Sequence, residues 1–503
     1  MASAGNGLGR RDLFKGAVAA GLTAGLLGPS PARARPPSVL GTPAPWIPDR
    51  LQAPPRITQP AGTELFWNEV RKAFPLSDGY IHMNTGTTGS QPVFSLNNLA
   101  VYNAWKSRDP RDWQANLADA FPDLWRTLAQ RQADVAATYG ANANEIVLSY
   151  NTSDACNLIF AGTPWKPGDR IVTTTMEHPG MVGPLCWARD YHGVDVAIVE
   201  IPTDFTYSVD EFVSWFEAEL AKPLPAGAKQ YVAFSEITYK NGMRLPVQEI
   251  AAAAKKYGAY TICDTAHGWG MLPIDCHAYG VDFLAGAGHK WLCGGPGTGI
   301  LYVRHHGDDL PPWSGGNWPS YGNLFVKPSV RYENRSTWAP SAIQGRGETN
   351  TPALYGMTDS AQFFAQVGVR HIYDRGLALA AYLQQKIVNQ WGDAAITVRA
   401  PDVRYKTMLT SFNPFRDRND PAKFTAFNTA LNAVVARLAA GTPKIYIRTV
   451  TWRERRDGTA DDQIAFRVST HAMYTSWDDI DEMFAEVVRH CEDVSRETGL
   501  PLM

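Results

Sequence analysis

Cysteine is scarce in this sequence, and the cysteines present are not spaced as metal or redox motifs require. Six occur among 503 residues, and no two form a Cys-x-x-Cys pair. That pair is the common signature of structural zinc sites and of redox-active dithiols, so neither is indicated. We therefore predict no metal site, and interpret most of the cysteines as small apolar residues of buried strands and helices. They are Cys156, Cys186, Cys263, Cys276, Cys293 and Cys491.

An excess of charge of either sign is also absent. The chain carries 47 Lys and Arg against 49 Asp and Glu, a net charge of -2, so we expect no nucleic-acid partner. No long apolar run follows residue 34, so no transmembrane helix and no stable membrane insertion are expected. The length, the apolar fraction of 45% and the charged fraction of 19% indicate a globular protein with a large domain and a smaller one.

The first 34 residues have a different composition from the rest of the chain. Arg10 and Arg11 are followed by a mildly apolar run over residues 16–28, and Ala32 and Ala34 form an A-x-A cleavage pattern. This segment resembles a twin-arginine export signal. As a membrane anchor the run is too short and too rich in Gly and Ala. We expect the twin-arginine export machinery to carry the folded protein out, so that the mature protein is periplasmic or secreted.

Beyond the signal, residues 35–79 form a Pro-rich arm followed by an N-terminal helix over residues 63–74. Residues 80–356 alternate helical patterns with short apolar strands, which predicts an α/β domain with a mainly parallel seven-stranded sheet. A long helical stretch over residues 351–391 leads into a smaller C-terminal α/β domain, residues 357–503. Its expected strands are 405–412, 445–451 and 463–469. Those of the large domain are 145–150, 170–175, 195–200, 230–235, 260–264, 282–285 and 299–304.

Two polar side chains follow neighbouring strands of the predicted sheet. Asp264 ends the strand 260–264, and Lys290 follows the next strand in the turn Gly288-His289-Lys290. Ligands of such sheets bind at the carboxyl ends of the strands. A lysine can form a Schiff base with the aldehyde of pyridoxal 5'-phosphate (PLP), and an aspartate can hold the ring nitrogen protonated. Together, Asp264 and Lys290 predict a PLP site. Taken singly, Lys290 is equally well explained as an ordinary lysine of a loop, and Asp264 as the cap of a following helix.

Other strand ends supply candidates for the remainder of such a site. Ser153 and Asp154 open a helix after the strand 145–150, where a phosphate binds readily, although an ordinary capping sequence looks the same. His178 follows the strand 170–175 and is placed to cover the pyridine ring and assist proton transfer. His267, three residues after Asp264, is a candidate partner of the phenolic oxygen of the cofactor.

A substrate carboxylate needs a cationic partner, and one arginine lies within an apolar strand. Arg467 is flanked by Phe466 and Val468, and a buried guanidinium requires an anion. The anion is either the α-carboxylate of a substrate or an acidic side chain of the protein, which forms an internal salt bridge. Asn84, at the end of the short strand 80–84, is a second candidate for substrate binding.

These motifs, in this order, resemble the class V aminotransferase family of fold-type I PLP enzymes, and in particular its isopenicillin-N-epimerase-like branch. The resemblance implies Lys290 as the Schiff-base residue, with Asp264 at the pyridine nitrogen and His178 over the ring. Ser153 and His289 would hold the phosphate, and Arg467 the carboxylate. It also implies a homodimer in which Thr349 reaches the phosphate in the partner. The segments that carry the resemblance are residues 153–155, 177–179, 264–267, 289–291, 347–352 and 467–469.

Two departures from the family pattern affect the expected chemistry. Ala287 stands where many relatives carry a Ser or Thr that donates to the phosphate, so backbone groups or Thr349 are expected to compensate. No cysteine occurs between Cys293 and Cys491, whereas cysteine desulfurases of the family need a nucleophilic cysteine on a small-domain loop. We therefore predict that the protein is not a persulfide-forming desulfurase.

The reaction itself stays open at this point. We expect chemistry at the α-carbon of an amino acid, or of an amino-acid moiety in a peptide or secondary metabolite, of the aminotransferase or epimerase type. A C–S lyase acting on a cysteine conjugate or sulfoxide is the alternative. A non-catalytic PLP-binding regulator is disfavoured, because such proteins usually join the fold to a DNA-binding helix-turn-helix domain, whereas the N-terminus here resembles an export signal. The aromatic residues between the lysine loop and Thr349 either border a bulky substrate or pack a dimer interface. They are Trp313, Trp318, Tyr321, Tyr332 and Trp338.

Overall fold

A seven-stranded sheet forms the centre of the structure, a computed structural model that describes residues 50–201, 208–314, 340–345, 347–400, 402–453 and 462–503. All neighbouring strands run parallel except at β8, which is antiparallel to both of its neighbours. The mainly parallel sheet predicted from the sequence is thus confirmed, strand for strand. In spatial order the strands are β2 (Ile146–Ser149), β8 (Gly299–Val303), β7 (Phe283–Ala287), β6 (Tyr260–Asp264), β5 (Gln230–Ser235), β3 (Arg170–Thr174) and β4 (Asp195–Val199).

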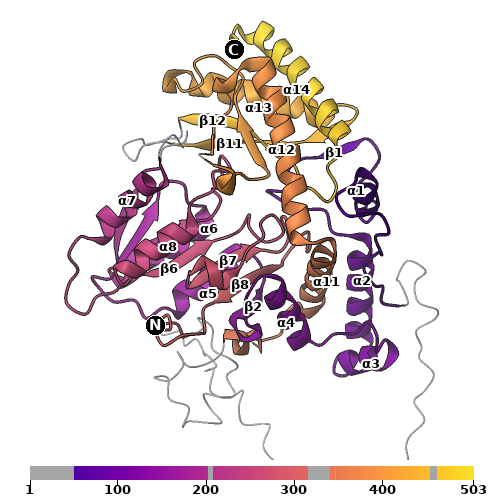
Figure 1. The fold of residues 1–503 in the computed structure, drawn as a ribbon, viewed down its shortest axis with the longest axis vertical. Coiled ribbons are helices and arrows are strands. Elements are labelled where there is room, and N and C mark those ends of the chain that lie inside the picture. Colours follow the sequence, from indigo (N-terminus) through magenta and orange to yellow (C-terminus); the bar gives the residue numbers. More distant parts are fainter. Residues whose placement is uncertain (1–49, 202–207, 315–339, 346, 401, 454–461) are drawn as a thin grey trace, which may run out of the picture. The chain divides into compact units, whose positions relative to one another are not determined.

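Both faces of this sheet are buried, which explains why its strands are continuously apolar. Ile171 packs on one side with α5 (Thr152–Gly162) and α6 (Pro179–His192). Its neighbour Val172 packs on the other side with α4 (Leu128–Thr138), α7 (Val209–Leu220) and α8 (Val247–Lys256). The domain is therefore a sheet between two helical layers, and Figure 1 shows helices on both sides of it.

A second hydrophobic core lies around a three-stranded antiparallel sheet, in the order β11 (Arg448–Trp452), β12 (Gln463–Ser469) and β9 (Leu409–Phe412). Ile81 and Met83 join this core because β1 (Tyr80–His82) pairs with β10 (Lys444–Tyr446). The domain boundary at residues 356 and 357 stays a prediction. The helices of this core are α12 (Val369–Trp391), α13 (Phe424–Ala440) and α14 (Trp477–Thr498).

The structure divides two of the predicted elements. The helical stretch 351–391 is α11 (Thr351–Val367) followed by α12, and the break falls at Gly368, whose φ is +95°. The expected strand 445–451 is β10 and β11, which pair with different partners. The remaining helices are α1 (Glu64–Arg71), α2 (Val93–Arg108), α3 (Trp113–Ala120) and α9 (Cys276–Tyr279).

Three predictions fall outside the described residues. They concern the expected export signal over residues 1–34, most of the Pro-rich arm, and the aromatic residues Trp318, Tyr321, Tyr332 and Trp338. The described residues belong to one compact unit. None of their helices has the length and apolar character needed to cross a membrane.

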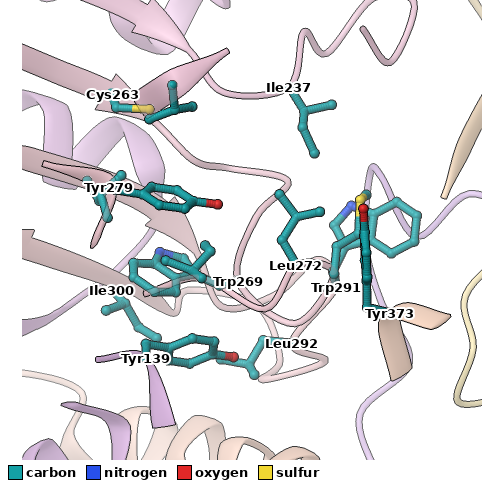
Figure 2. Close-up of a cluster of buried hydrophobic side chains, with 14 of the residues drawn as sticks. Tyr139, Ile237, Cys263, Trp269, Leu272, Tyr279, Trp291, Leu292, Ile300 and Tyr373 are labelled. Carbon is teal, nitrogen blue, oxygen red and sulfur yellow. The ribbon is translucent and has the colours of Figure 1, made fainter. Parts of the chain in front are cut away.

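The turn that carries Lys290 rests on a buried apolar cluster. Trp291 and Leu292 directly follow the lysine and are fully buried, with Trp269 and Leu272 in the same cluster (Figure 2). Gly270 permits this packing: its φ is +84°, and a Cβ there would lie 2.5 Å from the backbone of Trp291. Because the residues after the lysine are locked in the core, the position of the lysine itself is fixed.

Candidate active site

Lys290 lies in the turn that leaves β7 and is half-buried. Burial lowers the pKa of its amine to about 8, with Asp264 opposing the shift and the cations Arg467 and Arg448 adding to it. The loop after β1 covers this turn: the Gly89 N–H donates to the carbonyl of His289 at 2.8 Å. The structure thus gives the lysine amine a pKa close to neutrality, as a nucleophile or base requires.

Asp264 ends β6, the strand beside β7, and pairs in register with Ala285. Its carboxyl group is buried, and Oδ1 accepts a hydrogen bond from the Ala266 N–H at 2.8 Å. Burial raises the pKa of this group, and the nearby charge of Lys290 counteracts that effect. The structure therefore brings together the two residues on which the sequence prediction rested.

His178 begins α6 as its N-cap. Its Nδ1 accepts the Gly180 N–H at 3.0 Å, so the neutral ring carries its proton on Nε2. Burial and the charge of Lys290 lower the pKa of the imidazole to about 4. The ring also meets Tyr239 edge-on, with centroids 4.7 Å apart. The imidazole is held at one angle and stays uncharged at neutral pH.

Glu177, beside His178, fixes the strand ends around the site. Its buried carboxyl group accepts hydrogen bonds from the hydroxyls of Thr174 and Ser235, each at 2.6 Å, and so joins the ends of β3 and β5. Burial raises its pKa to about 7. Glu177 was not predicted from the sequence, although an acidic residue that directly follows a buried strand is a detectable signal.

Ser153 stands in the first turn of α5, against the turn that holds His178. A Cβ on Gly180 would lie 2.4 Å from the Ser153 hydroxyl and 3.1 Å from Nδ1 of His178, so only glycine allows this approach. Thr152, one residue earlier, has a buried hydroxyl for which the described residues offer no hydrogen-bond partner. A helix N-terminus with two hydroxyls attracts a phosphate, and Thr152 supplies a donor that Ala287 lacks.

Asp154 makes two hydrogen bonds within its own turn. Its carboxylate accepts the Tyr150 N–H at 3.0 Å, and its N–H donates to the side chain of Asn151 at 2.8 Å. These contacts shape the start of α5, and a carboxylate repels a phosphate. The geometry thus supports Asp154 as a residue that forms the cradle, and its predicted contact with the cofactor stays a prediction.

His267 is buried and lacks one hydrogen bond. Its Nδ1 accepts the indole N–H of Trp291 at 3.0 Å, so the neutral ring carries its proton on Nε2. Burial and the charge of Lys290 hold the pKa of the imidazole well below its ordinary value. Within the described residues Nε2 has no acceptor. A buried donor without a partner is expected where a bound molecule supplies an acceptor.

His289 and Thr349 differ in their placement. His289 is half-buried beside Lys290, and its Nδ1 lies 3.3 Å from the Thr298 carbonyl. The pKa of its imidazole is lowered by burial and by Lys290. Thr349 precedes α11, with its hydroxyl 3.3 Å from that of Thr351 and its carbonyl 3.5 Å from the amine of Lys106. His289 therefore lies in the site beside Lys290, whereas Thr349 lies at the start of α11.

Arg467, in the central strand of the second sheet, is only 1% exposed. It donates to the carbonyl of Tyr239, and its Nη2 lies 3.3 Å from both Asn84 Oδ1 and Thr87 Oγ1. None of its described hydrogen-bond partners is a carboxylate, and its Nε has no partner among the described residues. Burial and Arg448 lower the pKa of the guanidinium to about 9. The internal salt bridge left open by the sequence is therefore not formed among the described residues.

Arg448 and Tyr239 belong to the same neighbourhood, and neither was predicted from the sequence. Arg448 faces Arg467 across the β11–β12 ladder, and its Nη1 lies 3.3 Å from the hydroxyl of Thr87. Tyr239 accepts from Arg467 and packs on His178, so it links the two groups. Arg467 was predicted because it is an arginine within an apolar strand. Arg448 shows the same pattern in residues 445–451 and could have been predicted in the same way.

The described residues fit PLP. Asp264 offers a buried carboxylate for the ring nitrogen, the α5 N-terminus offers a phosphate cradle, and Nε2 of His267 offers an unused buried donor for the phenolic oxygen. Lys290 and Arg467, with the exposed Arg448, give the site a positive balance that suits a phosphate and a carboxylate.

Comparisons with solved structures agree with this fold. The cystine C–S lyase C-DES, in a complex with its product cysteine persulfide, superposes with a TM-score of 0.63 at 20% identity, over 82% of this chain and 97% of that one. The apo cysteine desulfurase of Thermococcus onnurineus NA1 gives a TM-score of 0.63 at 20% identity, over 88% and 100%. A C-DES variant carries glycine linked to its PLP cofactor.

Sequence relatives include enzymes of two activities. Probable cysteine desulfurase 2 of Mycobacterium leprae (strain TN) is 28% identical over 344 residues, which is 63% of this chain and 75% of the relative. Isopenicillin N epimerase of Streptomyces clavuligerus is 24% identical over 347 residues, 67% of this chain and 82% of the epimerase. The family model for aminotransferase class-V matches residues 84–423. The family predicted from the motifs is confirmed: the chain belongs to the class V aminotransferase family of PLP-dependent enzymes.

Proposed function

We propose that this enzyme acts at the α-carbon of an amino acid, or of an amino-acid moiety in a peptide or secondary metabolite, in a reaction of the aminotransferase or epimerase type. The observation that carries the proposal is the pairing of Lys290 with Arg467. A lysine amine with a pKa of about 8 lies close to a buried guanidinium whose described partners include no acid. Such a guanidinium binds a carboxylate in a bidentate way, which places the neighbouring α-carbon beside the amine.

Each chemical group of the cofactor is assigned to different residues of the site. Asp264 would pair with the ring nitrogen and His267 with the phenolic oxygen, while His178 would cover the ring. Ser153, Thr152 and His289 would hold the phosphate. Bound PLP withdraws electrons from the substrate nitrogen and so weakens the bonds at the α-carbon. The protein then decides which bond breaks by the orientation that it imposes on the substrate.

Lys290 is the group best suited to accept the α-proton. Its pKa of about 8 makes a substantial fraction neutral near pH 7 to 8, and a base works best with a pKa near the working pH. His178 is a weaker base, because its pKa is about 4 and its Nδ1 already accepts the Gly180 N–H. His178 therefore supports proton transfer as an Nε2–H donor, and Lys290 removes the proton.

A C–S lyase is the second candidate, favoured by the desulfurases and the C–S lyase among the similar proteins. Both reactions begin with loss of the α-proton, so the residues above serve either. A persulfide-forming desulfurase is disfavoured by the described cysteines. Cys293 and Cys491 are buried, and burial raises the pKa of both thiols, which keeps them protonated.

The working form proposed for this enzyme is an exported homodimer. Thr349, at the start of α11, would reach the phosphate of the partner subunit. Export by the twin-arginine route, proposed from Arg10 and Arg11, moves a folded protein and so suits an enzyme that binds its cofactor before it leaves the cytoplasm. A periplasmic or secreted enzyme is separated from the cytoplasmic keto acids, which favours tailoring of a secreted peptide over central nitrogen metabolism.

The deciding experiment is an incubation of purified holoenzyme with candidate amino acids and peptides in heavy water, followed by mass analysis. With a keto acid added as amino-group acceptor, deuterium at the α-carbon with inversion indicates an epimerase, and a keto product that keeps its side chain indicates an aminotransferase. Release of the sulfur group together with pyruvate and ammonia indicates a lyase. The matched variants are Lys290→Ala, which should stop every outcome, and Lys255→Ala at an exposed lysine of α8, which should retain activity. A Lys290→Ala enzyme with wild-type turnover contradicts the proposal.

A further inference from the structure

A second cluster of chemically active side chains lies away from the PLP site. Glu145, just before β2, is completely buried. Its Oε2 lies 2.7 Å from Nε2 of His277 in α9, and its Oε1 lies 2.7 Å from Nδ1 of His306, which follows β8. The two imidazole rings pack edge to face with centroids 4.4 Å apart. Three segments distant in sequence thus converge on one carboxylate.

This buried carboxylate lacks a permanent cation. Both of its oxygens are occupied by donors, because the backbone N–H groups of Asn142 and His305 lie at 2.8 and 2.9 Å in addition to the imidazoles. Among the described residues, its only ionic partners are the two histidines, which are charged only when protonated. A fully buried anion is costly without a positive partner, and neutral imidazoles carry no charge. A bound cation would supply the missing positive charge.

The donor set determines which cation fits. One ligand atom from each of the three residues lies within 4.8 Å of the others. Two imidazole nitrogens and one carboxylate oxygen suit Zn²⁺ and similar transition-metal ions, and they are a poor set for Ca²⁺ or Mg²⁺, which prefer oxygen alone. The two imidazoles are 38% and 42% exposed, so they can receive an ion together with a water as the fourth ligand.

We propose that Glu145, His277 and His306 bind a divalent transition-metal ion of the Zn²⁺ type. With bonds of about 2.1 Å, tetrahedral ligands lie about 3.4 Å apart, so each exposed imidazole moves outward by about 0.7 Å from its present distance. The proton on each facing ring nitrogen shifts to the other nitrogen of the ring, which leaves a lone pair for the metal. The N–H groups of Asn142 and His305 keep the carboxylate oriented.

The position of this site in the sheet indicates a stabilising role. Phe283 at the start of β7 pairs with Val303 at the end of β8, so His306 lies at the edge of the sheet where β7 begins. Lys290 follows the opposite end of β7. Five residues of strand separate the two edges by about 16 Å. The ion therefore joins the segments around β2, α9 and β8, and takes no part in the chemistry at Lys290.

The test is a titration of chelator-treated holoenzyme, free of any histidine tag, with zinc chloride. Calorimetry is expected to show one ion per chain, and the melting temperature is expected to rise as the ion binds. His277→Ala and His306→Ala should each weaken binding by about 100-fold or more, because a lost ligand costs at least as much as a lost supporting contact. His371→Ala, at an exposed histidine of α12, is the matched control and should bind as the wild type does.

The absorbance of the bound cofactor serves as an independent readout. It should be the same in all variants, which shows that they are folded and that the two sites are separate. The proposal is overturned if zinc does not bind saturably, or if the His277→Ala/His306→Ala double variant binds zinc as the wild type does.

Discussion

Replacing Arg467 with Met is expected to stabilise the apoprotein while it removes the carboxylate site. The pKa of the buried guanidinium falls from 12.5 to about 9. This difference corresponds to a cost of about 5 kcal/mol for holding the cation in the folded state. Because the folded pKa lies below the unfolded one, the cost is fully present below pH 9 and shrinks as the pH rises toward 12.5. The full cost is therefore present at neutral pH.

Methionine fills much of the same volume but loses the hydrogen bonds to Tyr239, Asn84 and Thr87. Two of these bonds are long, at 3.3 Å, and the acceptors left behind are uncharged, so leaving them without this donor costs about 1 kcal/mol each. The balance leaves Arg467→Met about 2 kcal/mol more stable than the wild type. Loss of a bidentate, charge-assisted contact to the substrate should raise KM by about 100-fold or more.

Urea unfolding of the apoproteins at neutral pH measures the first effect, and steady-state kinetics with an identified substrate measures the second. Arg399→Met is the matched control: Arg399 is exposed and has no contact with the site, and its replacement should change stability by no more than about 0.5 kcal/mol. The reasoning is refuted if Arg467→Met is clearly less stable than the wild type and keeps the wild-type KM.

Three further predictions concern the cofactor side of the site. Lys290→Ala should abolish the yellow absorbance of the protein-bound cofactor, and a variant that keeps this absorbance would remove Lys290 from its role. Recombination of the apoprotein with PLP, followed by stopped-flow absorbance, should speed up as the pH rises through about 8, since only the neutral amine of Lys290 adds to an aldehyde; a rate independent of pH would contradict the assignment. Trp291→Phe removes the donor to Nδ1 of His267, so nitrogen NMR of the apoprotein should show a mixture of ring tautomers, whereas an unchanged Nε2–H form would show that Trp291 does not position this histidine.

The fold was largely predictable because its strands are short apolar runs with turn residues at both ends. Asp264 and Lys290 were found for the same reason, since polar residues directly after buried strands are conspicuous. The break at Gly368 was harder to predict, because an isolated glycine is tolerated inside many helices. Local pattern thus identified the elements and the residues at their ends.

The partners of each residue were not predictable, because they come from distant segments. Whether Arg467 faces an acid or a ligand depends on residues 84–87 and 239, and nothing in the order of the sequence fixes that environment. The cluster of Glu145, His277 and His306 was missed for the same reason: its ligands have no common motif, and the prediction of no metal site considered only the cysteines. Contacts between residues that are far apart in the sequence can be identified only once the fold is known.

The loop between β1 and α2 explains how the two cores act together. Lys290 directly precedes Trp291 of the first core, and Arg467 lies between Phe466 and Val468 of the second, with which β1 is also associated through its pairing with β10. Within this loop, a Cβ on Gly86 would lie 3.0 Å from Nη2 of Arg467 and 3.2 Å from the ring of His267. A Cβ on Gly89 would lie 2.1 Å from the carbonyl oxygen of Lys290. Because the backbone of Gly86 packs against the guanidinium and that of Gly89 against the lysine turn, the loop sets their separation, and any displacement of the second core moves the carboxylate site relative to the amine.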